Sequence, residues 1–140
     1  MKSYVNWSFA YALLGMAAGV FYREFTKINA FQGVTTLGKV HTHTLVLGML
    51  FFLLVLLLNQ HFHLNKHKYH SLFMKLYNAG VLFTITMMII RGITQVLAVP
   101  LSSGMDAAIS GLSGIGHILT GTGIILFFII LRASITSNDI

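Results

Sequence analysis

The feature that most constrains this chain is a pair of histidines joined to a short apolar run. His41 and His43 stand directly before residues 45–58, a run of about 14 residues without a polar side chain. As a helix this run would be roughly 21 Å long, whereas the hydrocarbon core of a bilayer is about 30 Å thick. A helix that spans the bilayer here must therefore carry both histidines with it. Because ionisable side chains are costly inside a membrane, the pair predicts a functional site.

The composition of the chain is that of a membrane protein. Of the 140 residues, 56% are hydrophobic and only 9% are charged, and the mean hydropathy is +0.80. Cysteine is absent, which excludes thiolate metal sites, iron–sulfur clusters, thioether-attached haem and disulfides. The nine lysines and arginines are scattered at the ends of apolar segments, so they indicate membrane anchoring and not a nucleic-acid partner.

Four apolar segments predict an all-α protein, a four-helix transmembrane bundle that forms one domain over residues 1–140. The expected helices cover about residues 7–24, 39–59, 72–98 and 108–132. Pro100 is expected to end the third helix, and the Ser-Ser-Gly sequence at 102–104 is expected to form a turn. With both termini in the cytoplasm, five basic residues lie on the inner side and four on the outer side, so we prefer this orientation.

Two of the histidines share an expected depth with two arginines. Arg23, His43, Arg91 and His117 each lie about 15 or 16 residues from the helix end on the side of Trp7, or roughly 23–24 Å. The second histidine of the pair, His41, lies nearer the surface.

The faces of the helices separate the candidate residues further. Positions two apart on a helix differ by about 200°, so His41 and His43 cannot ligate the same ion. One of them is expected to face the bundle interior, and the other a neighbouring subunit, lipid or a second cofactor. In the fourth segment, His117 lies on a stripe of small residues at helical spacing, with a further glycine close by: Ser110, Ser113, Gly114, Gly121 and Gly123. Such a surface suits either a porphyrin face or the close packing of two membrane helices.

Neutral imidazoles from two helices of a bundle are good axial ligands for haem iron, and nearby cations can neutralise the haem propionates. The candidate metal and cofactor ligands are His41, His43 and His117, and the candidate propionate partners are Arg23, Lys39 and Arg91. The histidines at 61, 63, 67 and 70 form a basic loop that is either solvated or a zinc or copper site. Only three carboxylates occur and no nucleophile–base pair is visible, so we assign no catalytic residue.

The motifs Gly38-Lys39-Val40-His41-Thr42-His43-Thr44-Leu45-Val46-Leu47-Gly48 and Gly116-His117-Ile118-Leu119-Thr120-Gly121 carry two resemblances. Over nearly its full length, the chain resembles a family of small bacterial four-helix membrane proteins of unknown function. The His-x-His stretch with a glycine five positions on is similar to a helix of the catalytic subunit of haem–copper oxidases and nitric-oxide reductases.

The second resemblance implies that His41 and His43 serve different haems and that His117 is the partner ligand. It also implies that the chain equals one four-helix arc of the twelve-helix oxidase subunit, and hence forms a homotrimer. The histidine pair and the tyrosine that build the oxidase copper site have no counterpart here.

These observations favour a haem b protein of a bacterial inner membrane, with an electron-transfer, haem-sensing or haem-handling role. It would work with a redox partner, and copper is a further possible metal. A histidine-lined transporter of metal ions or protons is the first alternative, and a haem-free accessory subunit of a respiratory complex is the second.

Overall fold

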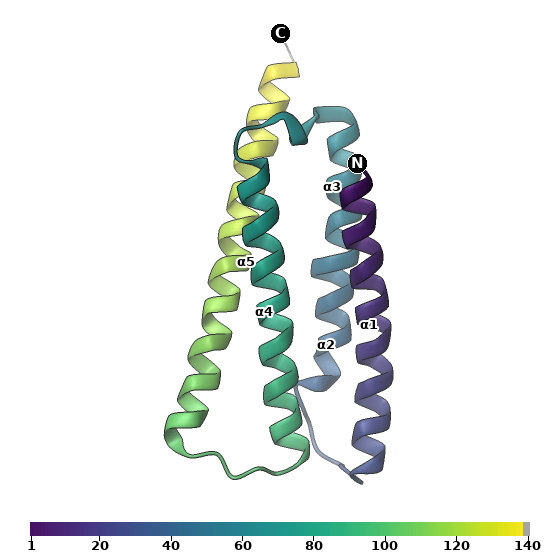
Figure 1. Cartoon of the computed structure of the whole chain (residues 1–140), viewed down its shortest axis with the longest axis vertical. Helices are drawn as coiled ribbons and strands as arrows, with labels where there is room; N and C mark the ends of the chain where they lie inside the picture. Colours follow the sequence, from purple (N-terminus) through teal and green to yellow (C-terminus); the bar gives the residue numbers. More distant parts are fainter. Residues whose placement is uncertain (139–140) are drawn as a thin grey trace.

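The computed structural model describes residues 1–138, which are almost entirely helical (Figure 1). Its elements are α1 (Lys2–Ile28), α2 (Leu37–His43), the π-helix η1 (Thr44–Leu50), α3 (Phe51–Phe62), the 3-10 turn η2 (Leu64–Lys66), α4 (His70–Val96) and α5 (Ser103–Asn138). α2, η1 and α3 form one continuous rod, so the described residues contain four long helices and no strand.

All four long helices are long and apolar enough to cross a membrane. The candidate spans are Lys2–Ile28, Leu37–Phe62, His70–Val96 and Ser103–Thr136. The predicted all-α four-helix bundle is therefore confirmed, and the chain is a multi-pass membrane protein.

The fourth helix starts earlier than the sequence pattern predicts. It begins at Ser103, where a start near residue 108 and a turn at 102–104 were expected. Ser102 caps the N-terminus of this helix. Its Oγ accepts a hydrogen bond from the Met105 N–H (3.3 Å), and its carbonyl accepts one from the Asp106 N–H (3.0 Å). Asp106 in the first turn adds a favourable interaction with the helix dipole.

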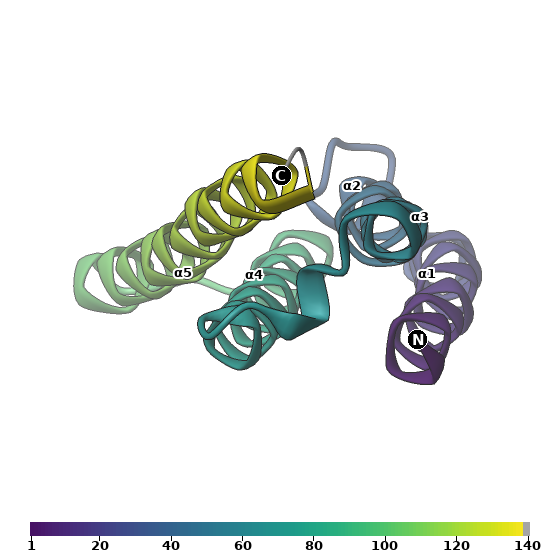
Figure 2. The same ribbon diagram turned by 90° about the horizontal axis from the view of Figure 1, so that it is seen from above.

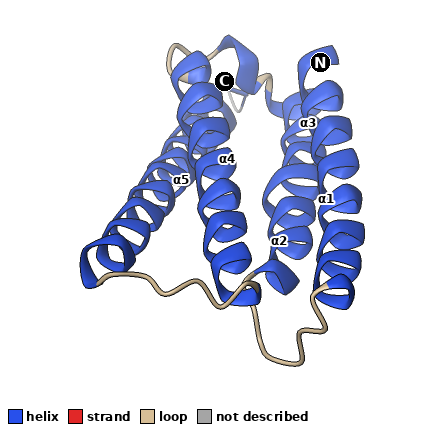
Figure 3. Cartoon of the chain, turned by 60° about the horizontal axis from the view of Figure 1, so that its bottom comes forward, coloured by secondary structure: helices blue, strands red, loops and turns tan. Residues whose placement is uncertain are grey.

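The helices run alternately up and down, and the connections alternate between two ends of the bundle (Figures 1 and 3). We call the end that holds Met1 and η2 the upper end, and the end that holds the connections 29–36 and 97–102 the lower end. Seen from above, the α2–α3 rod lies between α1 and α4, and α5 packs along α4 with its upper end close to α3 (Figure 2).

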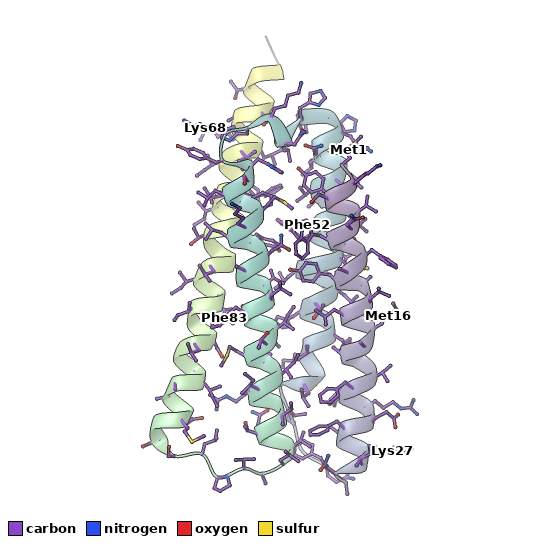
Figure 4. All side chains as sticks on the ribbon, viewed as in Figure 1. Met1, Met16, Lys27, Phe52, Lys68 and Phe83 are labelled. Atoms are coloured by element: carbon purple, nitrogen blue, oxygen red, sulfur yellow. The ribbon has the colours of Figure 1, made fainter. Side chains whose placement is uncertain are left out.

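Aromatic side chains fill the core of the upper half. Phe52 lies between the helices in Figure 4, fully buried, and its ring stacks on Tyr11 of α1 with 5.8 Å between centroids. Phe51 stacks on Tyr77 of α4 at 4.2 Å and meets Phe127 of α5 edge-on at 5.3 Å. One aromatic layer thus connects all four long helices.

The π-helical turn η1 is tied to both neighbouring helices by side-chain hydrogen bonds. Ser8 of α1 donates to the Met49 carbonyl (3.0 Å), and Tyr77 of α4 donates to the Leu47 carbonyl (2.8 Å). Gly48 allows the Tyr11 ring to pack directly on the backbone, since a Cβ there would lie 2.2 Å from the ring. π-Helical turns are rare and occur mostly near functional sites. This one begins directly after His43.

Candidate functional site

His43 and His117 make the same local hydrogen bond. The Nδ1 atom of His43 lies 2.9 Å from the Lys39 carbonyl, and that of His117 lies 2.8 Å from the Ser113 carbonyl. A carbonyl oxygen only accepts, so each Nδ1 carries a proton, and in the neutral imidazole the lone pair is then on Nε2. Metal-ligating histidines in proteins are commonly held in this way by a backbone carbonyl. Both imidazoles are therefore oriented as ligands that bind through Nε2.

α4 can be used as a ruler for the depth of the two histidines. Leu37 packs against Gly92, and Gly116 packs against Thr84. His43 lies six residues above Leu37, or about 9 Å, which places it level with about residue 86 of α4. His117 follows Gly116 directly and is level with about residue 83, so the two depths differ by roughly 5 Å. These contacts place the two histidines within roughly 5 Å of each other in depth along α4.

The same helical geometry gives the direction of each side chain. Around α2, seen from above, α1, α4 and α5 follow one another clockwise (Figure 2). His41 faces α1, and Leu37 faces α4. Going clockwise around the helix from His41, Leu37 comes first and His43 follows at about 160°. On α5, Gly116 faces α4. Seen from above, the next residue, His117, lies about 100° counterclockwise from Gly116 and is thus turned to the side where α2 lies. His43 and His117 thus lie on the same side of α4, but on helices whose lower parts diverge (Figure 2), and the structure does not bring the two imidazoles together as a ligand pair.

Open space adjoins His117 on α5. A Cβ added at Gly114 or Gly121, one turn to either side of His117, would meet no heavy atom within 4 Å. The His117 side chain is exposed, and so is its neighbour Ile118 (69%). Gly116 and Gly123 contact α4. These two glycines therefore serve close helix packing, which was the alternative role expected for the small residues. The two glycines beside His117 form a flat, open surface.

His41 differs from His43 in its contacts. It is half-buried against α1, where its Cβ lies 3.7 Å from a Cβ added at Gly19. Its Nδ1 is buried and has no hydrogen-bond partner, and its Nε2 lies 3.3 Å from the Thr42 hydroxyl. The expectation that one histidine of the pair reaches a neighbouring subunit, lipid or a second cofactor therefore does not describe His41, which faces its own α1.

The three candidate cations lie near the lower end and differ in their partners. Arg91 donates to the Asp106 carboxylate and to the Ser110 Oγ (2.6 Å), so its charge is largely compensated. Arg23 lies 3.7 Å from the carboxylate of Glu24 with most of its side chain exposed, and Lys39 is exposed.

The single depth expected for histidines and arginines does not hold for the arginines. Arg91 lies seven residues below Thr84 on α4, or about 10 Å. Arg23 lies four residues below Gly19, which contacts His41, so it is about 6 Å lower than that contact. The expected depth depended on where each helix ends, and α1 and α5 extend further than predicted.

The histidines of the expected loop do not form one unit. His61 belongs to the last turn of α3, and His70 begins α4 and lies 2.6 Å through Nε2 from the Tyr4 hydroxyl. Within residues 1–138, no group of three or more histidines and carboxylates is placed to hold a metal ion. The contact between Tyr4 and His70 joins residues 66 positions apart and has no signal in the sequence.

Comparison with known protein families matches residues 1–134 to a family described as a protein of unknown function (DUF2871). No curated protein and no solved structure matches the chain. The resemblance of the His-x-His helix to haem–copper oxidases thus has no support from these comparisons. Because the match spans nearly the whole sequence, the chain belongs to the DUF2871 family of proteins of unknown function.

Proposed function

We propose that this protein binds haem b inside the membrane, with His43 and His117 as the axial ligands. The observation that carries the proposal is the shared arrangement of the two imidazoles. Each donates Nδ1–H to the carbonyl four residues earlier and presents Nε2 as a ligand, at a similar depth and toward the same side of α4. His41 faces α1 instead, so it is not the partner of His117 in this proposal.

The surroundings of His117 fit a flat macrocycle. Gly114 and Gly121 leave the backbone of α5 open on both sides of the imidazole, and the other exposed side chains of this helix are mainly aliphatic. Such a surface can pack against a porphyrin face and exclude water from it. Lys39 is exposed one turn below His43, where its ammonium group is available for a propionate. Arg91 and Arg23 are weaker candidates because each already has a carboxylate partner.

Bound haem would supply one-electron chemistry, and the residues of this chain would hold its iron and set its environment. With His43 and His117 as its two iron ligands, such a haem would favour electron transfer, or haem sensing or handling, over oxygen reduction. The protein would exchange electrons with a redox partner. Copper is a further candidate metal for the same imidazoles.

The assembly and the location of the protein are part of the proposal. The exposed face of α5 around His117 is consistent with a homo-oligomer, and the oxidase resemblance favours a trimer. The bilayer is assigned to a bacterial inner membrane with the upper end in the cytoplasm, because five of the nine lysines and arginines lie at that end. The mass of the detergent-solubilised complex tests the trimer.

The direct test is an absorption spectrum of the purified protein after expression with ample haem. We expect a Soret band, and on reduction the sharp visible bands of a low-spin haem. His43→Ala and His117→Ala should each abolish or strongly shift these bands. His41→Ala should leave them in place, since that imidazole faces α1.

A matched control is His63→Asn, which alters a histidine outside the site. His63 has a positive φ of 50°, and Asn tolerates that conformation. This variant should retain the full spectrum. The proposal fails if the wild-type protein carries no haem, or if the His43 and His117 variants both keep an unchanged spectrum.

A further inference from the structure

A groove with two chemically different parts runs between α1 and α4. Its upper part is a hollow of about 320 Å³, bordered from α1 by Ser3 and Trp7. From α4, this hollow is bordered mainly by polar side chains, His70, Ser71, Lys75 and Asn78.

The lower part of the groove is entirely apolar. It is a hollow of about 290 Å³ that reaches from α1 across the lower end of α2 to α4. Its lining from α1 is Leu14, Ala17, Ala18 and Phe21, and Ile89 borders it from α4.

The two parts lie on one side of α1. Residues 3, 7, 14, 17 and 21 border the groove, and their spacings of three, four and seven are those of one helix face. From Ser3 to Phe21 this face is about 27 Å long. One leaflet of a bilayer, headgroups included, is about 20–22 Å thick, so the groove is long enough for one lipid molecule.

The charges around the upper part favour an anionic headgroup. The upper end carries Lys2, Lys66, Lys68, Lys75 and Arg132. Within residues 1–138 the carboxylates are those of Glu24 and Asp106, and both lie near the lower end beside arginines. Lys75 is exposed at the edge of the hollow, and the His70 ring is held there by the Tyr4 hydroxyl at 2.6 Å. Basic pockets between membrane helices are typical sites for anionic headgroups, and Trp7 is suited to the headgroup region.

We infer that this groove binds one anionic phospholipid of the surrounding bilayer. The phosphate lies between Lys75, Ser71 and Trp7, and an acyl chain follows the apolar part of the groove past Leu14 and Phe21. This site is separate from the histidine pair proposed for haem, because its residues lie on the α1 side of α4.

The test is native mass spectrometry of the full-length protein in detergent, after delipidation and titration with palmitoyl-oleoyl phosphatidylglycerol or phosphatidylcholine. We expect one phosphatidylglycerol molecule to be retained at an at least fivefold lower concentration than phosphatidylcholine. Lys75→Gln should reduce this preference to less than twofold. Lys27→Gln, which removes an exposed lysine from the lower end of the same pair of helices, should leave the preference unchanged.

A second variant tests the apolar part of the groove independently of charge. Ala17→Phe fills the lower hollow from an exposed position, and it should weaken retention of both lipids at least threefold while the melting temperature stays the same. Soluble glycerol 3-phosphate, which has the charge but no acyl chain, should not displace the lipid at equal concentration. Equal retention of the two lipids by the wild type, equal effects of Lys75→Gln and Lys27→Gln, or displacement by glycerol 3-phosphate would each overturn the inference.

Discussion

The two faces of α5 use the same residue type in opposite ways. On the face toward α4, Gly116 and Gly123 bring the helix backbones together, and a Cβ at either position would lie 3.0 Å or less from atoms of α4. Nearly a half-turn around the helix, Gly114 and Gly121 have no neighbour within 4 Å. His117 stands on the open side, between these two glycines in sequence.

This difference shows that a glycine-rich membrane helix need not use its glycines for packing alone. The packed face accounts for the attachment of α5 to the bundle, and the open face is not needed for that purpose. A flat, open surface beside an oriented imidazole is therefore better explained by a ligand or by a second chain than by the fold of the single chain.

The largest loss of stability is expected when a glycine of the packed face of α5 is enlarged. Gly116→Leu places a side chain where even a Cβ would be 2.6 Å from the Thr84 Oγ1 and 3.0 Å from the Thr84 amide nitrogen. Since the backbone of α4 must move, we expect a loss of about 3 kcal/mol in the free energy of unfolding. A thermal melt in detergent should show a large drop in Tm or no folded protein, and an unchanged Tm would refute the close contact.

A smaller loss is expected where the packed interior depends on a hydrogen bond. Tyr11→Phe removes the hydroxyl that donates to Asn78 Oδ1 at 3.0 Å in the buried space between α1 and α4. Leaving this acceptor unpaired should cost about 1–2 kcal/mol. Tyr22→Phe on the same helix is the control and should lower Tm much less. Equal Tm values for the two variants would contradict this role of Tyr11.

The lower end of α5 is held by an ion pair whose effect should be smaller still. Arg91→Gln breaks the bonds of α4 to Asp106 and Ser110 near the protein surface. Because partly exposed ion pairs contribute little, we expect a loss of about 1 kcal/mol or less, and a smaller one at high salt. Asp106→Asn should give a similar value, and a double-mutant cycle measures their coupling. Strictly additive single effects would show that the pair contributes nothing.

The smallest effect on stability is expected on the open face. Gly114→Leu meets no atom within 4 Å, and leucine favours a helix more than glycine does, so Tm should be unchanged or slightly higher. The same change places a bulky side chain one turn from His117 and should strongly reduce the haem spectrum of the proposed site. A normal spectrum in Gly114→Leu would mean that a haem on His117 does not lie over this face.

Much of the fold could be predicted from the sequence because the signal is local. A membrane-spanning helix satisfies its own backbone, so a long apolar segment is enough to identify it. The helix start at Ser103 could not be predicted, because a serine next to a glycine indicates a turn as readily as a helix cap. The hydrogen bonds from Met105 and Asp106 to Ser102 decide between them.

The candidate site was predictable only in part, because sequence signals are local and some of its features depend on contacts between helices. The rise per residue along a helix is regular, so counting residues along the sequence is enough to bring His43 and His117 to a similar depth. The partners of Arg91 could not be predicted. Asp106 is fifteen positions away and lies two residues before the expected start of the fourth helix. The contact of His70 with Tyr4 could not be predicted either, since most of the first two long helices lies between these residues in the sequence.

Hydropathy and helical periodicity are properties of single segments, so the sequence was enough to predict four membrane-spanning helices, the histidines within two of them, and a difference of about 200° in direction between His41 and His43. Only the tertiary structure decided that His41 faces α1 and His43 does not, which glycines of α5 pack and which stay open, and that α1 and α4 enclose a groove. The physical reason is that each of these facts depends on where a neighbouring helix lies, and no periodicity within one segment specifies the position of another.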